Sequence, residues 1–256
     1  METLLLLTCI TGVAFAERMP RLRFQPLRFA RPSLGTDLLY MASGALGLGL
    51  LARTAAARLT DGSAPLLEML SAWPWALAYA LGLVLYDLCA YLTHSLLLHR
   101  ISWLWRVHAV HHSTLALDWL AAFRAHVIEH ALRHLTSAFA LVLLGFPPDV
   151  VAVVAASFAA WAALGHANLE LPLRMLEPVL ITPRLHRLHH ATSTCDANFG
   201  TIFSVWDRLC GTLVSDGATG PIGVPGRLDA YPQTWIQQLI EPFRVRTRPP
   251  PVELEL

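Results

Sequence analysis

The chain has 256 residues, of which 55% are hydrophobic and only 14% are charged, and its mean hydropathy is +0.48. Soluble domains carry about 25% charged residues, so this composition indicates a membrane protein and excludes intrinsic disorder. The 19 basic residues, all arginine, nearly balance 18 acidic residues, and the resulting net charge of +1 argues against a nucleic-acid-binding protein.

The first apolar run covers residues 4–16, and five arginines follow it within residues 18–31. A signal peptide would suit the short apolar core and the triplet Ala14-Phe15-Ala16, which resembles a cleavage site. However, the segment starts with Glu2 and no basic residue, and the arginines after it would resist translocation. We therefore favour a retained first membrane helix.

Three more apolar segments follow along the chain. The second covers about residues 37–51, and the third covers about residues 66–92 and leads directly into His94. The fourth, residues 135–165, is too long for one span of about 20 residues. Phe146-Pro147-Pro148-Asp149 interrupts it, which predicts a helical hairpin in the membrane.

We expect an all-α polytopic membrane protein with about four transmembrane helices and a helical histidine cap that faces the cytosol. No period-two alternation long enough for a sheet is present. A hairpin returns the chain to the face that it left, so polar clusters before and after it can meet. Arginines flank these clusters, and the positive-inside rule assigns that face to the cytoplasm.

The expected organisation is one functional domain in three parts. Residues 1–92 form the N-terminal transmembrane helices, and residues 93–212 form a histidine-cluster catalytic region that includes the hairpin. Residues 213–256 are rich in Gly, Pro and scattered charge, which predicts a soluble C-terminal tail. Within it, residues 235–243 predict a short helix on the membrane surface.

Histidine is the anomalous residue type, because all twelve histidines lie between His94 and His190. Eight of them form three clusters: His94-x4-His99, His108-x-x-His111-His112 and His186-x-x-His189-His190. A single histidine near a membrane is usually an interfacial residue, but burying eight rings without a metal would be costly. The four cysteines stand far apart with no C-x-x-C pair, which argues against a thiolate zinc site.

Helical geometry predicts how these rings can share metal ions. In a regular helix His108 lies about 60° from His111 and about 40° from His112, whereas the last two are about 100° apart. The adjacent pair should therefore point toward two ions, and two such motifs that face each other predict a dinuclear site. His94 and His99 are about 140° apart, so either the helix is distorted near residues 100–102 or the two serve different metals.

The ligand type leaves the metal open among Fe, Zn, Cu and Ni. No H-E-x-x-H motif is present, which argues against a zinc protease, and imidazole-bound metals beside a bilayer favour redox chemistry on an apolar substrate. A metal transporter should place polar groups at the bilayer midplane, and the apolar segments contain almost none. A non-redox zinc enzyme that acts on lipids remains an alternative.

Longer motifs surround the histidines. They are Asp87-Leu-Cys-Ala-Tyr-Leu-Thr-His94, Trp103-Leu-Trp-Arg-Val-His108-Ala-Val-His111-His112-Ser113, Thr182-Pro-Arg-Leu-His186-Arg-Leu-His189-His190, Asn198-Phe-Gly200 and Trp206-Asp-Arg-Leu-Cys-Gly-Thr212. Over about residues 87–243 the sequence resembles the fatty acid hydroxylase/sterol desaturase superfamily. The spacing of the first cluster is closer to fatty acid 2-hydroxylases and acyl desaturases than to the sterol-type members.

This resemblance implies an integral-membrane enzyme in which two iron ions, with zinc as a substitute, activate O2 at a cytosolic face. The enzyme would hydroxylate or desaturate a fatty-acyl, sterol or isoprenoid C–H bond in lipid biosynthesis. Electrons would come from a ferredoxin- or cytochrome-type protein and its reductase. We expect a multi-pass protein of the bacterial inner membrane in preference to the endoplasmic reticulum.

The resemblance also implies a set of metal ligands, which are His94, His99, His108, His111, His112, His166, His186, His189 and His190. Candidates for additional ligands, or for groups that hold the ligands, are His126, His130, Asp87, Glu129, Asn168, Asp196 and Asn198. His126, His130 and His134 are spaced by four and would share one helix face. They are either such groups or a wet interfacial stripe beside Arg124 and Arg133.

Overall fold

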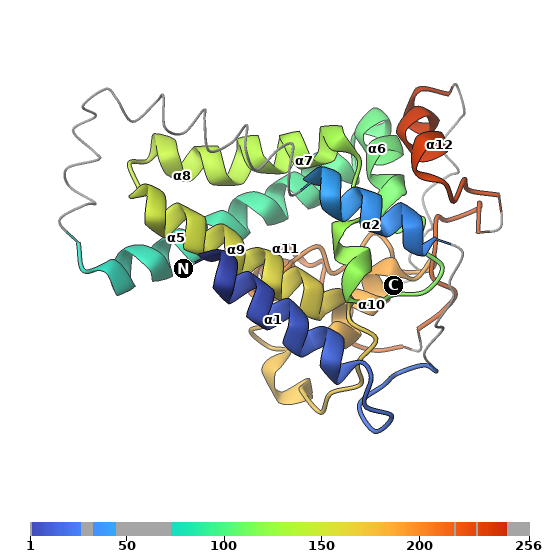
Figure 1. Ribbon diagram of the computed structural model, residues 1–256, viewed down its shortest axis with the longest axis horizontal. Helices are drawn as coiled ribbons and strands as arrows, with labels where there is room; N and C mark the ends of the chain where they lie inside the picture. The colour runs from blue at the N-terminus through green and yellow to red at the C-terminus, as the bar shows by residue number, and fades with distance from the viewer. Residues whose placement is uncertain (1, 27–32, 45–72, 218, 229, 245–256) are drawn as a thin grey trace.

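The computed structural model describes residues 2–26, 33–44, 73–217, 219–228 and 230–244. Within these ranges the protein is helical, and its only β-type pairings are three isolated bridges, which confirms the all-α prediction for the described part of the chain. Figure 1 shows long helices on one side and short helices on the other. Parts of the apolar segments expected at residues 37–51 and 66–92 lie outside the described residues.

Among the described residues, two helices are long and apolar enough to cross a membrane. The first is α5 (Trp75–Leu92) with its continuation η2 (Thr93–Leu98), and the second is α9 (Pro148–His166). At about 1.5 Å per residue they measure about 36 and 28 Å, close to the thickness of a bilayer core of about 30 Å. Trp75 Nε1 donates to Asp149 Oδ2 (2.9 Å), so both helices start at the same end of the molecule.

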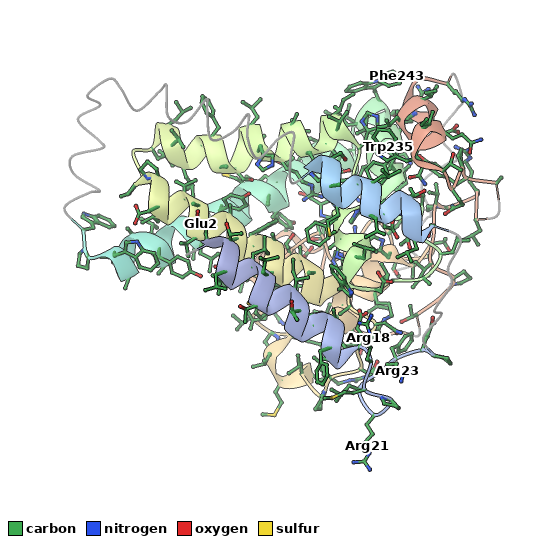
Figure 2. The ribbon with its side chains drawn as sticks, viewed as in Figure 1. Glu2, Arg18, Arg21, Arg23, Trp235 and Phe243 are labelled. Atoms are coloured by element: carbon green, nitrogen blue, oxygen red, sulfur yellow. The ribbon has the colours of Figure 1, made fainter. Side chains whose placement is uncertain are left out.

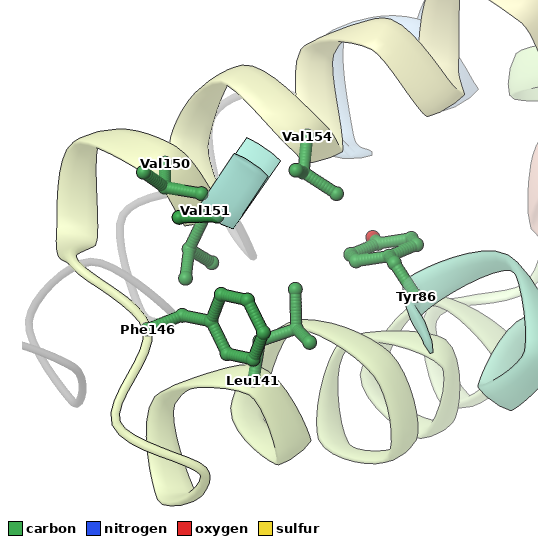
Figure 3. Packing of buried hydrophobic residues seen from close by; sticks show 7 residues of the cluster. Tyr86, Leu141, Phe146, Val150, Val151 and Val154 are labelled. Carbon is green, nitrogen blue, oxygen red and sulfur yellow. The ribbon is translucent and has the colours of Figure 1, made fainter. Parts of the chain in front are cut away.

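The predicted break at the two prolines is confirmed. The helix before it runs through α7 (Val127–Arg133), η4 (His134–Ala138) and α8 (Phe139–Leu143), and α9 begins at Pro148. Gly145 has a φ of +84°, a conformation that favours glycine and lets the chain reverse. Phe146 and Leu141 pack against Val150, Val154 and Tyr86, as Figure 3 shows, and this apolar core fixes the hairpin to α5.

The N-terminal helix α1 (Glu2–Ala16) lies along α9 and buries none of its residues. Its end is fixed by the buried Glu17, whose Oε1 accepts hydrogen bonds from the backbone N–H groups of Trp119 (2.9 Å) and Asn168 (2.8 Å). Thus α1 is attached to the part of the molecule that carries the histidines.

The remaining helices are short and gather where α5 and α9 end (Figure 1). They are α2 (Leu34–Ser43), α6 (Ser102–His112), η3 (Trp119–Phe123), η5 (Arg174–Leu176), α10 (Pro183–His190), α11 (Val205–Cys210), α12 (Trp235–Ile240) and η6 (Glu241–Phe243). The helix expected at residues 235–243 is present as α12 and η6. Val224 and Tyr231 are buried against Trp105 and Val110, so the C-terminal segment packs directly on α6.

Candidate metal centre

Nine buried histidines from four separate segments, which are η2 with the residue after it, α6, α9 and α10, converge at the ends of α5 and α9. Their ring nitrogens form two groups, and within each group one nitrogen of every ring lies within 4.8 Å of the others. We call site 1 the group of His94, His99, His108, His112 and His189, and site 2 the group of His111, His166, His186 and His190. The nine are the same nine that the sequence predicts as ligands.

Each of the two H-x-x-H-H motifs contributes two histidines to one site and the third histidine to the other site. On α6, His108 and His112 belong to site 1 and His111 belongs to site 2. On α10 the assignment is reversed, since His186 and His190 belong to site 2 and His189 to site 1. Residues four apart share a helix face, whereas adjacent residues diverge by about 100°. The predicted division of adjacent histidines between two groups is therefore observed in both motifs.

A π-helical turn brings His94 and His99 together. In η2 the N–H of His99 donates to the carbonyl of His94 (3.1 Å), so residues five apart lie one above the other. The ring centroids are 5.0 Å apart and both rings belong to site 1. Of the two alternatives left by the sequence, a distorted helix is the one observed. The distortion covers Thr93–Leu98 and lies before the residues 100–102 that we expected to carry it.

Backbone carbonyls orient four of the nine rings. The Nδ1 atoms of these rings lie 2.7–2.9 Å from carbonyl oxygens: His94 from Phe199, His111 from Arg124, His166 from Ala162, and His189 from Ala197. A carbonyl oxygen only accepts, so each Nδ1 carries the proton and each Nε2 of the neutral ring keeps a lone pair. Such partners fix the tautomer and the orientation of metal-binding histidines.

Two carboxylates have the same role in site 1. His99 Nδ1 donates to Asp196 Oδ1 (3.0 Å), and His108 Nδ1 donates to Glu129 Oε1 (2.9 Å). Arg133 Nε lies 2.9 Å from the same oxygen of Glu129. Asp196 and Glu129 were both proposed from the sequence, and both lie one hydrogen bond behind a site 1 histidine.

The donor atoms fit metal ions. Nε2 of His94 lies 3.0 Å from Nε2 of His108, and Nε2 of His111 lies 3.1 Å from Nε2 of His166. Because the Nδ1 atoms of these four rings carry the protons, two lone pairs face each other in each pair and repel unless a cation lies between them. Both nitrogens of the buried His112 also have no hydrogen-bond partner among the described residues.

Burial keeps these histidines in the neutral form, which can bind metal. For His108, His111, His112, His186, His189 and His190, burial is the largest cause of a pKa well below the usual value, and neighbouring imidazoles lower it further. A neutral imidazole offers its lone pair to a metal without first losing a proton.

Comparison with known proteins agrees with this geometry. The model of the fatty acid hydroxylase family matches residues 79–212, just over half of the chain and the region that holds all nine clustered histidines. The chain belongs to the fatty acid hydroxylase family. No solved structure matches it.

Several named proteins are similar to this member of the fatty acid hydroxylase family. Ornithine lipid hydroxylase OlsE of Rhizobium tropici is 32% identical over 180 residues, which cover 69% of this chain and 53% of that protein. Alkylglycerol monooxygenase of Danio rerio is 34% identical over 161 residues, or 60% of this chain and 34% of that enzyme. The human alkylglycerol monooxygenase is 28% identical over 160 residues, 59% of this chain and 34% of the relative. The chain thus spans between a third and about half of the length of these curated relatives.

Other residues proposed from the sequence lie outside both groups. His126 precedes α7, accepts from the N–H of Ile128 (3.2 Å), and its Nε2 lies 3.1 Å from the carbonyl of Leu239. His126 therefore does not share the regular helix face expected for it with His130 and His134. His130 belongs to neither site. Its ring packs against Gly44, and its Nε2 lies 3.2 Å from the position that a Cβ on Gly44 would take.

Asp87, Asn198 and Asn168 connect backbone segments around the sites. Asp87 accepts hydrogen bonds from Ile202 N (2.9 Å) and Phe203 N (3.0 Å), and Asn198 bonds both the N–H and the C=O of Val214. Asn168 makes the same pair of bonds to Gln25. Sequence reasoning missed the carbonyls of residues 124, 162, 197 and 199, because a backbone acceptor leaves no residue-type signal.

Proposed function

We propose that this protein is a membrane-bound di-iron oxygenase that hydroxylates a C–H bond of a lipid. The observation that carries the proposal is the pair of buried imidazole groups, in which protonated Nδ1 atoms leave lone pairs converging on two points. The names of the relatives support incorporation of oxygen, because they are a lipid hydroxylase and monooxygenases.

Two iron ions held by the histidines would supply the redox chemistry that reduces O2 and oxidises the C–H bond. The overall reaction takes up O2, two electrons and two protons, and it yields the hydroxylated lipid and water. The chain holds the imidazoles in one tautomer through carbonyl and carboxylate acceptors. The apolar helices α5 and α9 exclude water from the side on which a lipid chain would enter.

The proposed substrate is a polar membrane lipid with an acyl or alkyl chain. The similar proteins are named for an ornithine lipid and for alkylglycerols, which favours such a chain over a sterol or an isoprenoid. Electrons would be delivered by a separate ferredoxin- or cytochrome-type protein and its reductase. We propose hydroxylation ahead of desaturation because the similar proteins are named as a hydroxylase and as monooxygenases.

We further propose a multi-pass protein of the bacterial inner membrane with the metal sites on the cytoplasmic side. The helices α5 and α9 would span the bilayer, and α1 and the helix of residues 127–143 would enter it beside them, giving four membrane helices. Figure 2 shows Arg18, Arg21 and Arg23 at the end of α1 opposite Glu2. Basic residues at the histidine-bearing end support a cytoplasmic orientation.

The test is heterologous expression of the chain beside a matched His111→Ala variant, followed by untargeted lipid profiling. We expect the wild-type chain to yield lipids that gain one oxygen atom and the variant to yield none. A loss of two hydrogens would identify a desaturase instead. Metal analysis of anaerobically purified protein should find iron, and zinc as the sole metal of active protein would contradict the assignment. Lipid profiles without any difference across several hosts would overturn the proposed function.

A further inference from the structure

Arg124 is a buried arginine whose side chain and backbone serve different parts of the molecule. It lies between η3 and α7 and none of its surface is exposed. Its Nε donates to Asp37 Oδ1 (2.5 Å), and its Nη1 donates to Ser113 Oγ (3.2 Å). Its backbone carbonyl accepts the Nδ1–H of His111 (2.9 Å). One residue therefore connects a buried ion pair to a histidine of site 2.

The ion pair with Asp37 is costly to keep. Asp37 lies in the first turn of α2 and is fully buried, so both charges have lost their hydration. The desolvation of a buried ion pair is seldom offset by the attraction between its charges, and such a pair contributes little net stability over apolar residues of similar shape. The pair does fix the position of Arg124, and with it the carbonyl oxygen that accepts the Nδ1–H of His111.

The C-terminal segment is also hydrogen-bonded to Arg124 and to Ser113. Gln233 Nε2 donates to the carbonyl of Ser113 (3.1 Å), and Gln238 Nε2 donates to Ser113 Oγ (2.9 Å). Gln233 Oε1 also accepts from Arg124 Nη1 (3.4 Å). Ser113 follows His112 directly and caps α6 at its C-terminal end. Asp37 of α2 and the two glutamines of the C-terminal segment are thus hydrogen-bonded to the residues that carry and orient His111.

We propose that Asp37, Ser113, Arg124, Gln233 and Gln238 form a positioning network that sets the imidazole of His111 for metal binding at site 2. The inference rests on the proposed metal centre and adds to it the residues that hold one ligand from a distance. Site 2 has four imidazoles and site 1 has five, so displacing one ring removes a larger share of the ligands at site 2. Loss of an outer partner of a metal ligand typically weakens metal affinity about 10- to 100-fold.

The experiment titrates the purified full-length chain with Co²⁺ and reads the metal content and the ligand-field spectrum of each site. Arg124→Leu and Asp37→Asn each break the ion pair, and the double variant Asp37→Leu/Arg124→Leu removes both charges. Arg124→Lys keeps a charge opposite Asp37. The matched control is Arg227→Leu, which breaks an ion pair with the buried Glu241 (2.7 Å). Neither of these two side chains is hydrogen-bonded to a histidine among the described residues.

We expect Arg124→Leu and Asp37→Asn to raise the dissociation constant of one of the two metals about 10- to 100-fold and to leave the other within about twofold. Arg124→Lys should recover part of the loss, and Arg227→Leu should bind both metals as the wild type does. The double variant should regain thermal stability relative to the single variants, because no charge is left unpaired. It should still bind one of the two metals more weakly than the wild type does.

Three results would overturn the inference. The first is equal release of both metals from Arg124→Leu, which is what a general loss of folding would produce. The second is a double variant with wild-type affinity for both metals. The third is a wild-type chain that holds fewer than two metals, which would remove the metal centre as well. A wild-type chain that binds two metals in this titration but hydroxylates no lipid would contradict the proposed function alone.

Discussion

Nδ1 of His108 lies 2.9 Å from Oε1 of Glu129, and both side chains are almost completely buried. The carboxylate accepts the Nδ1 proton and thereby directs the Nε2 lone pair of His108 into site 1. Arg133 contacts the same oxygen, so the carboxylate is held from the opposite side as well.

Replacing Glu129 by Leu should therefore weaken the metal at site 1. The variant leaves a buried N–H without an acceptor, and we expect the dissociation constant of that metal to rise about 10- to 100-fold. Equilibrium dialysis against iron under anaerobic conditions measures it. Glu241→Leu is the matched control, since Glu241 is equally buried but pairs with Arg227 and Arg244. Equal metal loss from the two variants would contradict the role assigned to Glu129.

Adjacent histidines should have separable effects on the two metals. His111 belongs to site 2 and His112 to site 1, although they are neighbours in the sequence. We expect His111→Ala and His112→Ala each to perturb one Mössbauer signal of ⁵⁷Fe-loaded protein and to leave the other signal in place. The double variant should perturb both. A single substitution that changes both signals to the same extent would show that the two groups are not separate metal sites.

Removal of the metals should destabilise the folded chain. The Nε2 lone pairs of His94 and His108, and those of His111 and His166, would then face each other at 3.0–3.1 Å with no cation between them. A metal that is present at 100 times its dissociation constant stabilises a protein by about 2.7 kcal/mol for each site. We expect chelation to lower the thermal midpoint by more than about 5 °C, measured by scanning fluorimetry in detergent. Readdition of iron should restore the midpoint, and an unchanged midpoint after chelation would count against metal-filled sites.

The division of the six histidines in the two H-x-x-H-H motifs could be predicted from the sequence because their spacing follows the helix period, whereas His166 is named only through the family resemblance. The i,i+4 pairs His108/His112 and His186/His190 each share a site, and the third histidine of each motif points to the other site. The prolines at 147 and 148 likewise marked the start of α9, since proline is accepted in the first turn of a helix but not in its interior.

What the sequence could not give is the local departure from that period and the distant backbone partners. A regular helix would place His94 and His99 about 140° apart, and only the π turn of η2 brings them together. Nothing in the residues Ser95 to Leu98 signals such a turn. The contact between Asp37 and Arg124 joins segments 87 residues apart, and tertiary packing rather than local pattern determines it.

Asp87 provides the last prediction, because it holds the loop that orients His94. Its carboxylate accepts from Ile202 N, Phe203 N and Trp206 Nε1 (2.9–3.0 Å), and Phe199 in the same loop supplies the carbonyl that accepts from His94. In Asp87→Asn one acceptor oxygen becomes an N–H₂ donor that faces these donors. We expect a loss of about 1–3 kcal/mol in the free energy of unfolding, because at least one buried N–H is left without a partner.

The loop and the ring of His94 should move together in this variant. Besides the lower stability, measured by denaturant unfolding, the site 1 spectrum of cobalt-loaded Asp87→Asn protein should broaden while the site 2 spectrum stays sharp. Asp149→Asn is the control, since Asp149 bonds Trp75 at the far end of α5 and α9. If Asp87→Asn lost stability and kept a sharp site 1 spectrum, Asp87 would hold the loop without influencing His94.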